Sequence, residues 1–221
     1  MFKPPQRDTL SAQVERNLRE AMMSGRFRPG ERLNIRALAT ALGTSPTPVR
    51  EALSRFAAEG AIEFNPGQSV RIPEFKPEVY SELIAIRMAL ESVAVERAVE
   101  RITDEEIGTV EATLKKYGKA VRAGKKDEIL SLSKKFRFGI YESARMPELL
   151  KLIEALWTRT APSLRLMYEN SAEDPALELT YSKLLNSLKV RDKVQAKLAV
   201  ERAISIALER LFIMQSSDKK T

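Results

Sequence analysis

Two predicted helices lie so close together that the gap between them constrains the fold more than any other feature of the sequence. Apolar residues at helical spacing predict one helix that ends at Gly43 and another that begins at Pro46, which leaves only Thr44 and Ser45 between them. Ser45 is suited to cap the second of these helices. Proline is tolerated at the first helical position because its missing N–H has no partner there. The sequence therefore predicts a tight helix-turn-helix.

Further elements flank this turn on both sides. Ahead of it, apolar residues recur every four positions and predict a first helix with an inner face formed by Leu10, Val14, Leu18 and Met22. The helix after the turn ends at Gly60 and has an apolar face formed by Val49, Ala52, Leu53 and Phe56. Two short strands are expected at residues 61–64 and 69–72, joined by the turn Asn65-Pro66-Gly67-Gln68. Three helices followed by a hairpin predict a winged helix-turn-helix domain over residues 1–75.

The chain changes character near residue 75. The segment around Pro73 and Pro77 is expected to be a linker, and long apolar-periodic segments follow it with almost no strand signal. These segments predict about six helices, at residues 77–101, 104–123, 126–144, 147–169, 175–190 and 192–215. In the first of these helices, the residues expected to face inward are Leu83, Ile86, Leu90, Val93, Ala94 and Ala98. Asp104 is expected to cap the start of the second helix. The predicted fold is mostly α, with an all-α bundle over residues 76–221.

The composition argues against most enzyme classes. The 221 residues include no cysteine and no histidine, which removes thiolate metal sites, the most common general base and the most common metal ligand. Glu91 and Asp192 are possible acid–base groups, but no paired constellation, phosphate-binding glycine loop or nucleophile motif accompanies them. No apolar run is long enough for a transmembrane helix, and the first ten residues lack the apolar stretch of a secretory signal. We therefore expect a cytoplasmic binding protein.

The net charge is +7, and the two parts of the chain differ in which basic residue they use. Residues 1–75 contain ten arginines and one lysine against eight acidic residues, whereas lysines outnumber arginines in the remainder. Arginine is preferred for contacts to phosphates and bases because its planar guanidinium donates several hydrogen bonds. The alternative interpretation is that surface arginines merely take the place of lysines.

Residues 10–72 resemble the DNA-binding domain of GntR-type bacterial transcription regulators. The segments that carry the resemblance are GRFRPGERL (25–33), LATALGTSPTPVREAL (38–53) and FAAEGAIEFNPGQSV (56–70). The helical remainder resembles the FCD effector domain of the FadR-like branch, through Arg87-Met-Ala-Leu-Glu91 and through Leu184-Leu-Asn-Ser-Leu188 followed by Asp192 and Ala196. Six helices rather than seven are typical of the VanR-like subgroup.

The resemblance implies a set of DNA contacts. In this family the third helix enters the major groove and the wing reaches the minor groove. The implied contact residues are Arg36, Ser45, Thr47 and Arg50, with Gly67 and Gln68 at the tip of the wing. The family often has an arginine directly after Ser45, but this chain has Pro46, which has no donor. Base reading at that position then shifts to Thr47 and Ser45, or its specificity is relaxed. An alternative for Arg50 is a structural ion pair with Glu51 or Glu20.

The resemblance also indicates where an effector would bind. Many FCD domains use one aspartate and three histidines to bind a metal that holds a carboxylate effector. The aligned residues here are Ser133, Arg137, Tyr181 and Ala203, so we expect no metal and no other cofactor. Arg137, aided by Arg87 and Arg159, would instead bind a small organic acid directly, with Tyr181 offering a hydroxyl and Glu91 pairing with Arg137 when the site is empty. In the alternative interpretation Arg137 lies on a solvated face beside Lys134 and Lys135, and Tyr181 belongs to the core.

Together these observations predict a homodimeric transcription regulator, and we expect it to be a repressor. It would bind a palindromic double-stranded DNA operator in the nucleoid and respond to a small anionic metabolite. Two alternatives remain at this stage. One is a dimer that binds DNA without sensing a ligand, and the other is an enzyme built on the helical domain.

Overall fold

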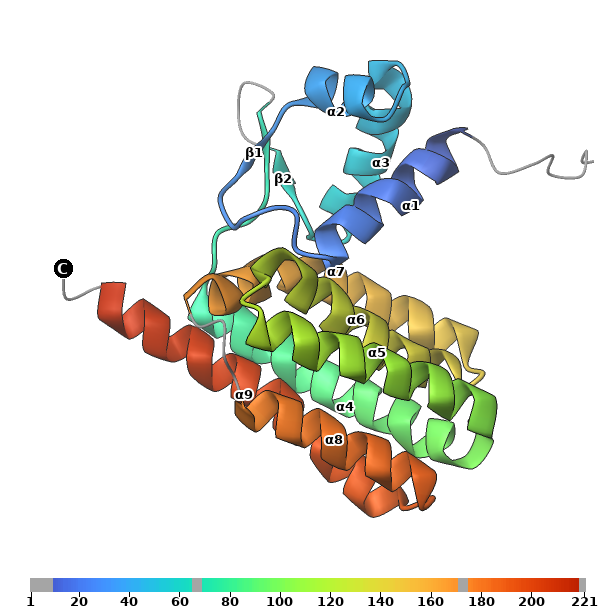
Figure 1. Cartoon of the computed structure of the whole chain (residues 1–221). Coiled ribbons are helices and arrows are strands. Elements are labelled where there is room, and N and C mark those ends of the chain that lie inside the picture. The colour runs from blue at the N-terminus through green and yellow to red at the C-terminus, as the bar shows by residue number, and fades with distance from the viewer. Residues whose placement is uncertain (1–9, 65–68, 171–174, 219–221) are drawn as a thin grey trace, which may run out of the picture.

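The computed structural model describes residues 10–64, 69–170 and 175–218 and places them in two parts (Figure 1). The first part comprises α1 (Leu10–Met23), β1 (Arg32–Leu33), α2 (Ile35–Ala41), α3 (Pro46–Ala58), β2 (Glu63–Phe64) and β3 (Val70–Arg71). The second comprises α4 (Pro77–Arg101), α5 (Asp104–Arg122), α6 (Lys126–Glu142), α7 (Pro147–Asn170), α8 (Pro175–Lys189) and α9 (Lys193–Asp218). This order confirms the predicted fold class, a winged helix-turn-helix followed by an all-α bundle.

The turn between α2 and α3 has the geometry that its sequence predicts. Gly43 adopts a left-handed backbone with φ of +64°, a conformation that glycine takes without strain, and it leads the chain out of α2. Ser45 is extended, with φ of −78° and ψ of 164°, and α3 begins at the next residue. Pro48 and Val49 are buried, so the first turn of α3 is anchored in the core of the winged helix.

The winged helix has its own small hydrophobic core, to which α1, α3 and the sheet contribute. Strand β3 lies between β1 and β2, and both pairings are antiparallel. The sequence analysis missed β1 and made the other two strands too long, because Ala61 and Ile62 are buried without belonging to a strand. It was also wrong about Leu10, which is exposed because it is the first residue of α1.

Helix α4 runs through the bundle and contacts α6, α7, α8 and α9. Its buried face follows residues such as Ile84, Glu91 and Val95, and two residues that were expected to face inward do not lie on it. Ile86 and Val93 are each 41% exposed. Each follows a buried position by two residues, a rotation of about 200° around the helix axis. The predicted inward face was therefore too wide.

The start of α5 is capped by Thr103 rather than by Asp104. The Thr103 hydroxyl accepts a hydrogen bond from the Glu106 backbone N–H, and the Glu106 carboxylate accepts one from the Thr103 backbone N–H. Asp104 is the first helical residue. The sequence Thr-x-x-Glu is the signal for this reciprocal cap, and the sequence analysis passed over it.

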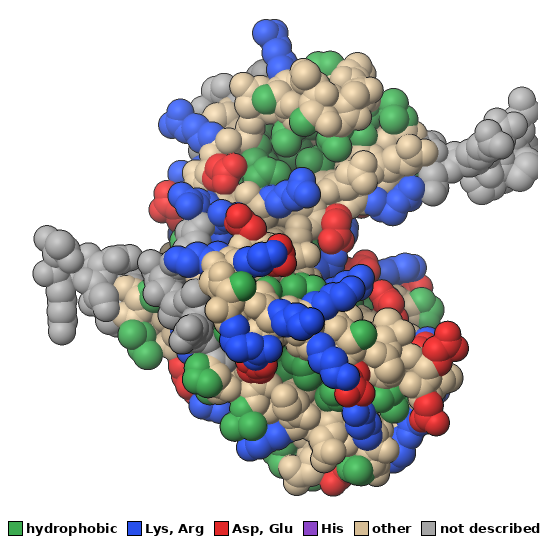
Figure 2. All heavy atoms as spheres, in the orientation of Figure 1, with side chains coloured by type: hydrophobic (Ala, Val, Ile, Leu, Met, Phe, Trp, Pro, Cys, Tyr) green, Lys and Arg blue, Asp and Glu red, His purple; other side chains and the backbone are tan. Residues whose placement is uncertain are grey.

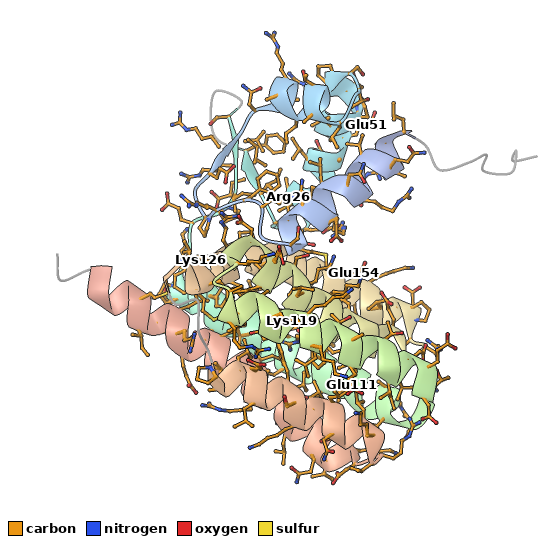
Figure 3. All side chains as sticks on the ribbon, in the orientation of Figure 1. Arg26, Glu51, Glu111, Lys119, Lys126 and Glu154 are labelled. Atoms are coloured by element: carbon orange, nitrogen blue, oxygen red, sulfur yellow. The ribbon has the colours of Figure 1, made fainter. Side chains whose placement is uncertain are left out.

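The winged helix sits on one side of the bundle, where the end of α1 meets α7 (Figure 1). Arg19 of α1 donates to both carboxylate oxygens of Glu59, just after α3, at 2.8 and 2.7 Å, and to the Thr158 hydroxyl of α7 at 3.3 Å. Figure 3 shows Arg26 of the winged helix and Glu154 of α7 on the two sides of this boundary. One arginine thus ties α1, the end of α3 and α7 together.

Candidate functional site

The polar residues implicated in DNA binding lie on the exposed side of the helix-turn-helix. Arg36 belongs to α2, Ser45 precedes α3, and Thr47 and Arg50 lie in the first turns of α3; all four are exposed. The Ser45 side chain forms no capping hydrogen bond with α3, so the expected cap is not made by its hydroxyl. Gly67 and Gln68, at the expected tip of the wing, lie outside the described residues.

The structure does not support an ion-pair role for Arg50. Among the described residues, neither Glu51 nor Glu20 pairs with it, and Glu20 instead pairs with Lys134 of α6. Several other arginines of the winged helix are engaged with carboxylates, namely Arg19, Arg55 and Arg71. On the face shown in Figure 2, basic and acidic side chains are interspersed over both parts of the molecule, with no continuous basic patch. Arg36 and Arg50 are exposed arginines of the helix-turn-helix.

The centre of the helical bundle contains a buried ionic cluster around the carboxylate of Glu91. One carboxylate oxygen accepts hydrogen bonds from Arg87 Nε at 2.7 Å and from Trp157 Nε1 at 3.0 Å. The other accepts from Arg137 Nη2 at 2.5 Å and from the Tyr141 hydroxyl. Both guanidiniums also lie over the Trp157 ring, with Cζ atoms 4.4 and 5.4 Å from its centroid. We call these five residues the central cluster.

The protonation states in the central cluster follow from its pairing. Burial alone would raise the pKa of Glu91, but the two neighbouring guanidiniums outweigh burial and hold this pKa below its usual value. Burial would lower the pKa of Arg137, and the Glu91 carboxylate raises it instead. Burial raises the pKa of Tyr141 well above its usual value, so its hydroxyl keeps the proton that it donates. The cluster therefore consists of two cations, one anion and a neutral phenol.

This balance leaves one positive charge in excess inside the bundle. Arg87 Nη1 donates to the Thr160 hydroxyl at 3.0 Å, but no acceptor for the buried Arg87 Nη2 exists among the described residues. Arg87 and Arg137 are only 1% and 3% exposed. A buried charge without full compensation costs several kcal/mol. Within the central cluster, one of the two guanidiniums therefore has no carboxylate of its own.

Comparison with known proteins identifies the two parts. Residues 10–72 match the bacterial regulatory proteins of the gntR family, and residues 82–205 match the FCD domain. The chain belongs to the GntR family. It is 37% identical over 187 residues to the HTH-type transcriptional regulator McbR of Escherichia coli K12, and the matched stretch covers 84% of this chain and 85% of McbR. The solved structure of E. coli McbR/YncC superposes with a TM-score of 0.86 at 34% identity and covers 94% of this chain and 99% of that one.

A more distant relative is named as a repressor. The chain is 25% identical over 205 residues to a probable D-xylose utilization operon transcriptional repressor of Paenarthrobacter nicotinovorans, over 91% of this chain and 88% of that protein. These matches confirm the predicted GntR regulator with an FCD domain.

The FCD positions that hold a metal in other members do not fit one here. Ser133, Arg137, Tyr181 and Ala203 are all buried in the bundle. The hydroxyls of Ser133 and Tyr181 bond each other at 2.7 Å, and Arg137 is a cation paired with Glu91. Within the described residues no group of three potential ligands lies close enough to bind a metal ion. A guanidinium that occupies a ligand position would repel a metal cation rather than bind it.

The structure shows where the side chains of Arg137, Tyr181 and Arg159 lie. Arg137 is buried in the bundle and not on a solvated face, and it is joined to Arg87 through Glu91. Tyr181 packs between Tyr117 and Phe136, as the core interpretation predicted. Arg159, which was expected to assist Arg137, lies instead beside Gly60 at the boundary with the winged helix. It faces away because its side chain projects from a different side of α7 than Trp157 and Thr160.

Sequence reasoning missed Tyr141 and Trp157, two of the five residues in the central cluster. One signal was available for Tyr141, because it follows Arg137 by four residues and so lies on the same helical face. No pattern in the sequence pointed to Trp157, which comes from a different helix. Asp192, considered as an acid–base group, accepts a hydrogen bond from the backbone N–H of Gln195 at 3.0 Å and so serves the start of α9. The described helices include none that is long and apolar enough to cross a bilayer.

Proposed function

We propose that two copies of this chain bind a palindromic operator through their helix-turn-helix surfaces and change their DNA affinity when a small carboxylate enters the central cluster. The observation that carries the sensing half is the buried excess positive charge at Arg87 and Arg137. The DNA-binding half rests on the exposed residues Arg36, Thr47 and Arg50 within a GntR domain. Ser45 joins them because its hydroxyl makes no cap, and Gly67 and Gln68 are proposed to reach the minor groove.

Replacing Arg50 by Ala is expected to weaken operator binding by about 1–3 kcal/mol, the range for an arginine that reaches a base or a phosphate. The side chain is exposed, so the fold is expected to stay intact. Operator DNA selected from a random pool would be titrated in an anisotropy assay. Arg97→Ala, which removes an exposed arginine from α4, is the matched control and should bind like the wild type. Wild-type affinity in a folded Arg50→Ala protein would contradict the assignment.

The central cluster has a direct mechanical connection to the DNA-binding domain through α7. Trp157 donates to Glu91, while the next residue, Thr158, accepts from Arg19 of α1. Arg19 in turn holds Glu59 at the end of α3. A carboxylate that replaces Glu91 on the arginines would release Trp157 from its acceptor and so shift α7 against α1. The ligand would thereby favour a different arrangement of the helix-turn-helix.

Replacing Arg137 by Met is expected to raise the ligand concentration needed for DNA release by about 30-fold or more, the effect of losing one partner in a buried charge pair. The remaining Arg87–Glu91 pair is neutral, so the fold and the basal DNA affinity should persist. Mono-, di- and tricarboxylates would first be screened for release of operator DNA from the wild type. Lys135→Met, an exposed cation on the same helix, is the control. Release at the wild-type concentration in Arg137→Met would refute this mechanism.

Exposed apolar residues on α4 support the proposed homodimer. Val79, Ile86 and Val93 are spaced by seven residues, so they form one stripe, and each is at least 41% exposed. Replacing Ile86 by Lys is expected to turn the dimer into a monomer of 24.9 kDa in light-scattering measurements. Leu152→Lys changes an exposed apolar residue on α7 and should leave the dimer intact. A wild-type chain that is monomeric at micromolar concentration would rule the dimer out.

Further parts of the proposal follow from the same interpretation. The division at residues 75 and 76 assigns DNA binding to the first part and both sensing and dimerisation to the second. Repression, location in the cytoplasm at the nucleoid, and the absence of catalysis fit a GntR regulator. The second candidate function is a dimer that binds DNA without sensing, which is favoured by the close packing of the central cluster. The screen for carboxylate-dependent DNA release separates the two.

A further inference from the structure

A cavity lies where the two domains meet, and none of the five residues of the central cluster lines it. It has a volume of about 360 Å³, within the range of small-molecule sites. Its walls come from the winged helix, from the linker at residues 73–76 and from α4 and α7. The residues that carry the argument are Gly60, Phe75, Lys76, Tyr80, Arg159 and Ser163. We call this space the junction cavity.

Arg159 is a cation that lacks a partner inside this cavity. Its Nε atom is buried and has no hydrogen-bond partner within the described part of the chain, while the residue as a whole is partly exposed. The guanidinium lies flat over Gly60, since a Cβ built on that glycine would be 3.4 Å from its Cζ atom. Leaving a buried charged donor unsatisfied is costly, and folded proteins rarely tolerate it without a purpose. Arg159 is therefore poised to bind an acceptor from outside the chain.

The charges around Arg159 favour an anion as that acceptor. Two acidic residues line the cavity, Glu63 and Glu74, but both are paired with Arg71, at 3.2 and 3.4 Å. The second cation in the wall is Lys76. Ser163 follows Arg159 by one helical turn on α7, is 6% exposed and also lines the cavity, so its hydroxyl is a second donor there. A guanidinium can donate to both oxygens of a carboxylate, and a hydroxyl can add a further hydrogen bond to one of them.

The rest of the wall is apolar and aromatic. Phe75 and Tyr80 form an edge-to-face pair with ring centroids 5.0 Å apart, and Ile62 and Leu83 extend this surface. Such a wall can pack against a planar ring or a branched chain, whereas a bare phosphate has no apolar part to pack there. We propose that the junction cavity binds a monocarboxylate with an aromatic or branched apolar body, through Arg159 and Ser163. Because both domains supply walls, occupancy stabilises this arrangement of the two domains.

The test uses three probes on the full-length protein: benzoate, phenylacetate and 4-methyl-2-oxopentanoate. Ligand-observed NMR and calorimetry are expected to show binding of at least one of them. Benzamide, the neutral isostere of benzoate, should bind at least tenfold more weakly than benzoate wherever benzoate binds. Failure of all three carboxylates to bind would overturn the proposal, and so would equal binding of benzoate and benzamide.

Variants locate the site and separate it from the central cluster. Arg159→Met should weaken binding at least tenfold, whereas Lys151→Met, which changes an exposed cation on the same helix, should bind like the wild type. Undiminished binding in Arg159→Met would overturn the proposal, and loss of binding in Arg137→Met would move the site to the central cluster. If circular dichroism shows that Arg159→Met is unfolded, Arg159→Lys replaces it. Its compact ammonium cannot bind bidentately, so affinity must fall severalfold, and unchanged affinity would overturn the assignment.

Discussion

Replacing Glu91 by Gln is expected to destabilise the protein by about 3–5 kcal/mol, although the two side chains have nearly the same shape. Glu91 is the only anion of the central cluster, and two buried guanidiniums donate to it. A neutral amide leaves both charges uncompensated in a region from which water is excluded. It also presents an NH₂ group where one carboxylate oxygen accepts hydrogen bonds. The cost comes from the stranded cations rather than from lost packing.

Urea denaturation would measure this loss, and the control is Glu82→Gln, an exposed acidic residue on the same helix. The melting temperature should fall by roughly 6–20 °C, at about 2–4 °C per kcal/mol for a chain of this size. The double variant Glu91→Gln with Arg137→Met removes one of the stranded charges and should recover part of the stability. A loss below about 1 kcal/mol, the scale of an exposed pair, would show that the cluster is open to solvent.

The same variant predicts a difference in acid stability. The pKa of Glu91 is lowered on folding, so its contribution is fully present above the unfolded value of 4.5 and is lost as the pH falls through the lower folded value. The wild type should therefore lose this part of its stability only below about pH 4.5. Glu91→Gln should lack this step, since it has no carboxylate to titrate at that position.

The sequence predicted the elements of the winged helix well because local signals define them. Gly43, Ser45 and Pro46 act on the backbone of their own turn, and Val49 and Phe56 of α3 are buried as their spacing predicts. Strand β1 was missed because two residues carry no periodicity, and its existence depends on pairing with Val70 and Arg71 far along the chain. Long-range pairing of this kind leaves no trace in a short sequence window.

The central cluster was only partly predictable for a similar reason. The pair Arg87 and Glu91 has the spacing of an ion pair on one helix, and the family alignment drew attention to Arg137. That all three meet Trp157 depends on how α4, α6 and α7 pack together. Arg159 shows the opposite failure, because it was expected to assist Arg137, whereas Trp157 and not Arg159 reaches the cluster from α7. The helix instead directs the two side chains to different sides.

Operator binding is expected to fall about 10³-fold between 50 and 200 mM salt, the largest effect predicted for this protein. Among the described residues of the winged helix, the exposed arginines that form no ion pair are Arg26, Arg32, Arg36 and Arg50. Arg26 lies near the boundary with the bundle (Figure 3), which leaves three for DNA. A dimer would then present about six such cations, and each phosphate contact adds about 0.9 to the slope of log affinity against log salt. A monomer with half as many contacts would lose only about 40-fold over the same range.

The slope also reveals what Arg50 touches. If Arg50 contacts phosphates, Arg50→Ala removes two contacts from the dimer, and the slope should fall by about 2. If Arg50 reads a base, the slope should stay nearly constant while affinity for the selected operator drops toward that for random DNA. Titrations of operator and random DNA at four salt concentrations distinguish these outcomes. A wild-type slope near zero would contradict electrostatic binding by these arginines, because phosphate contacts always release counterions.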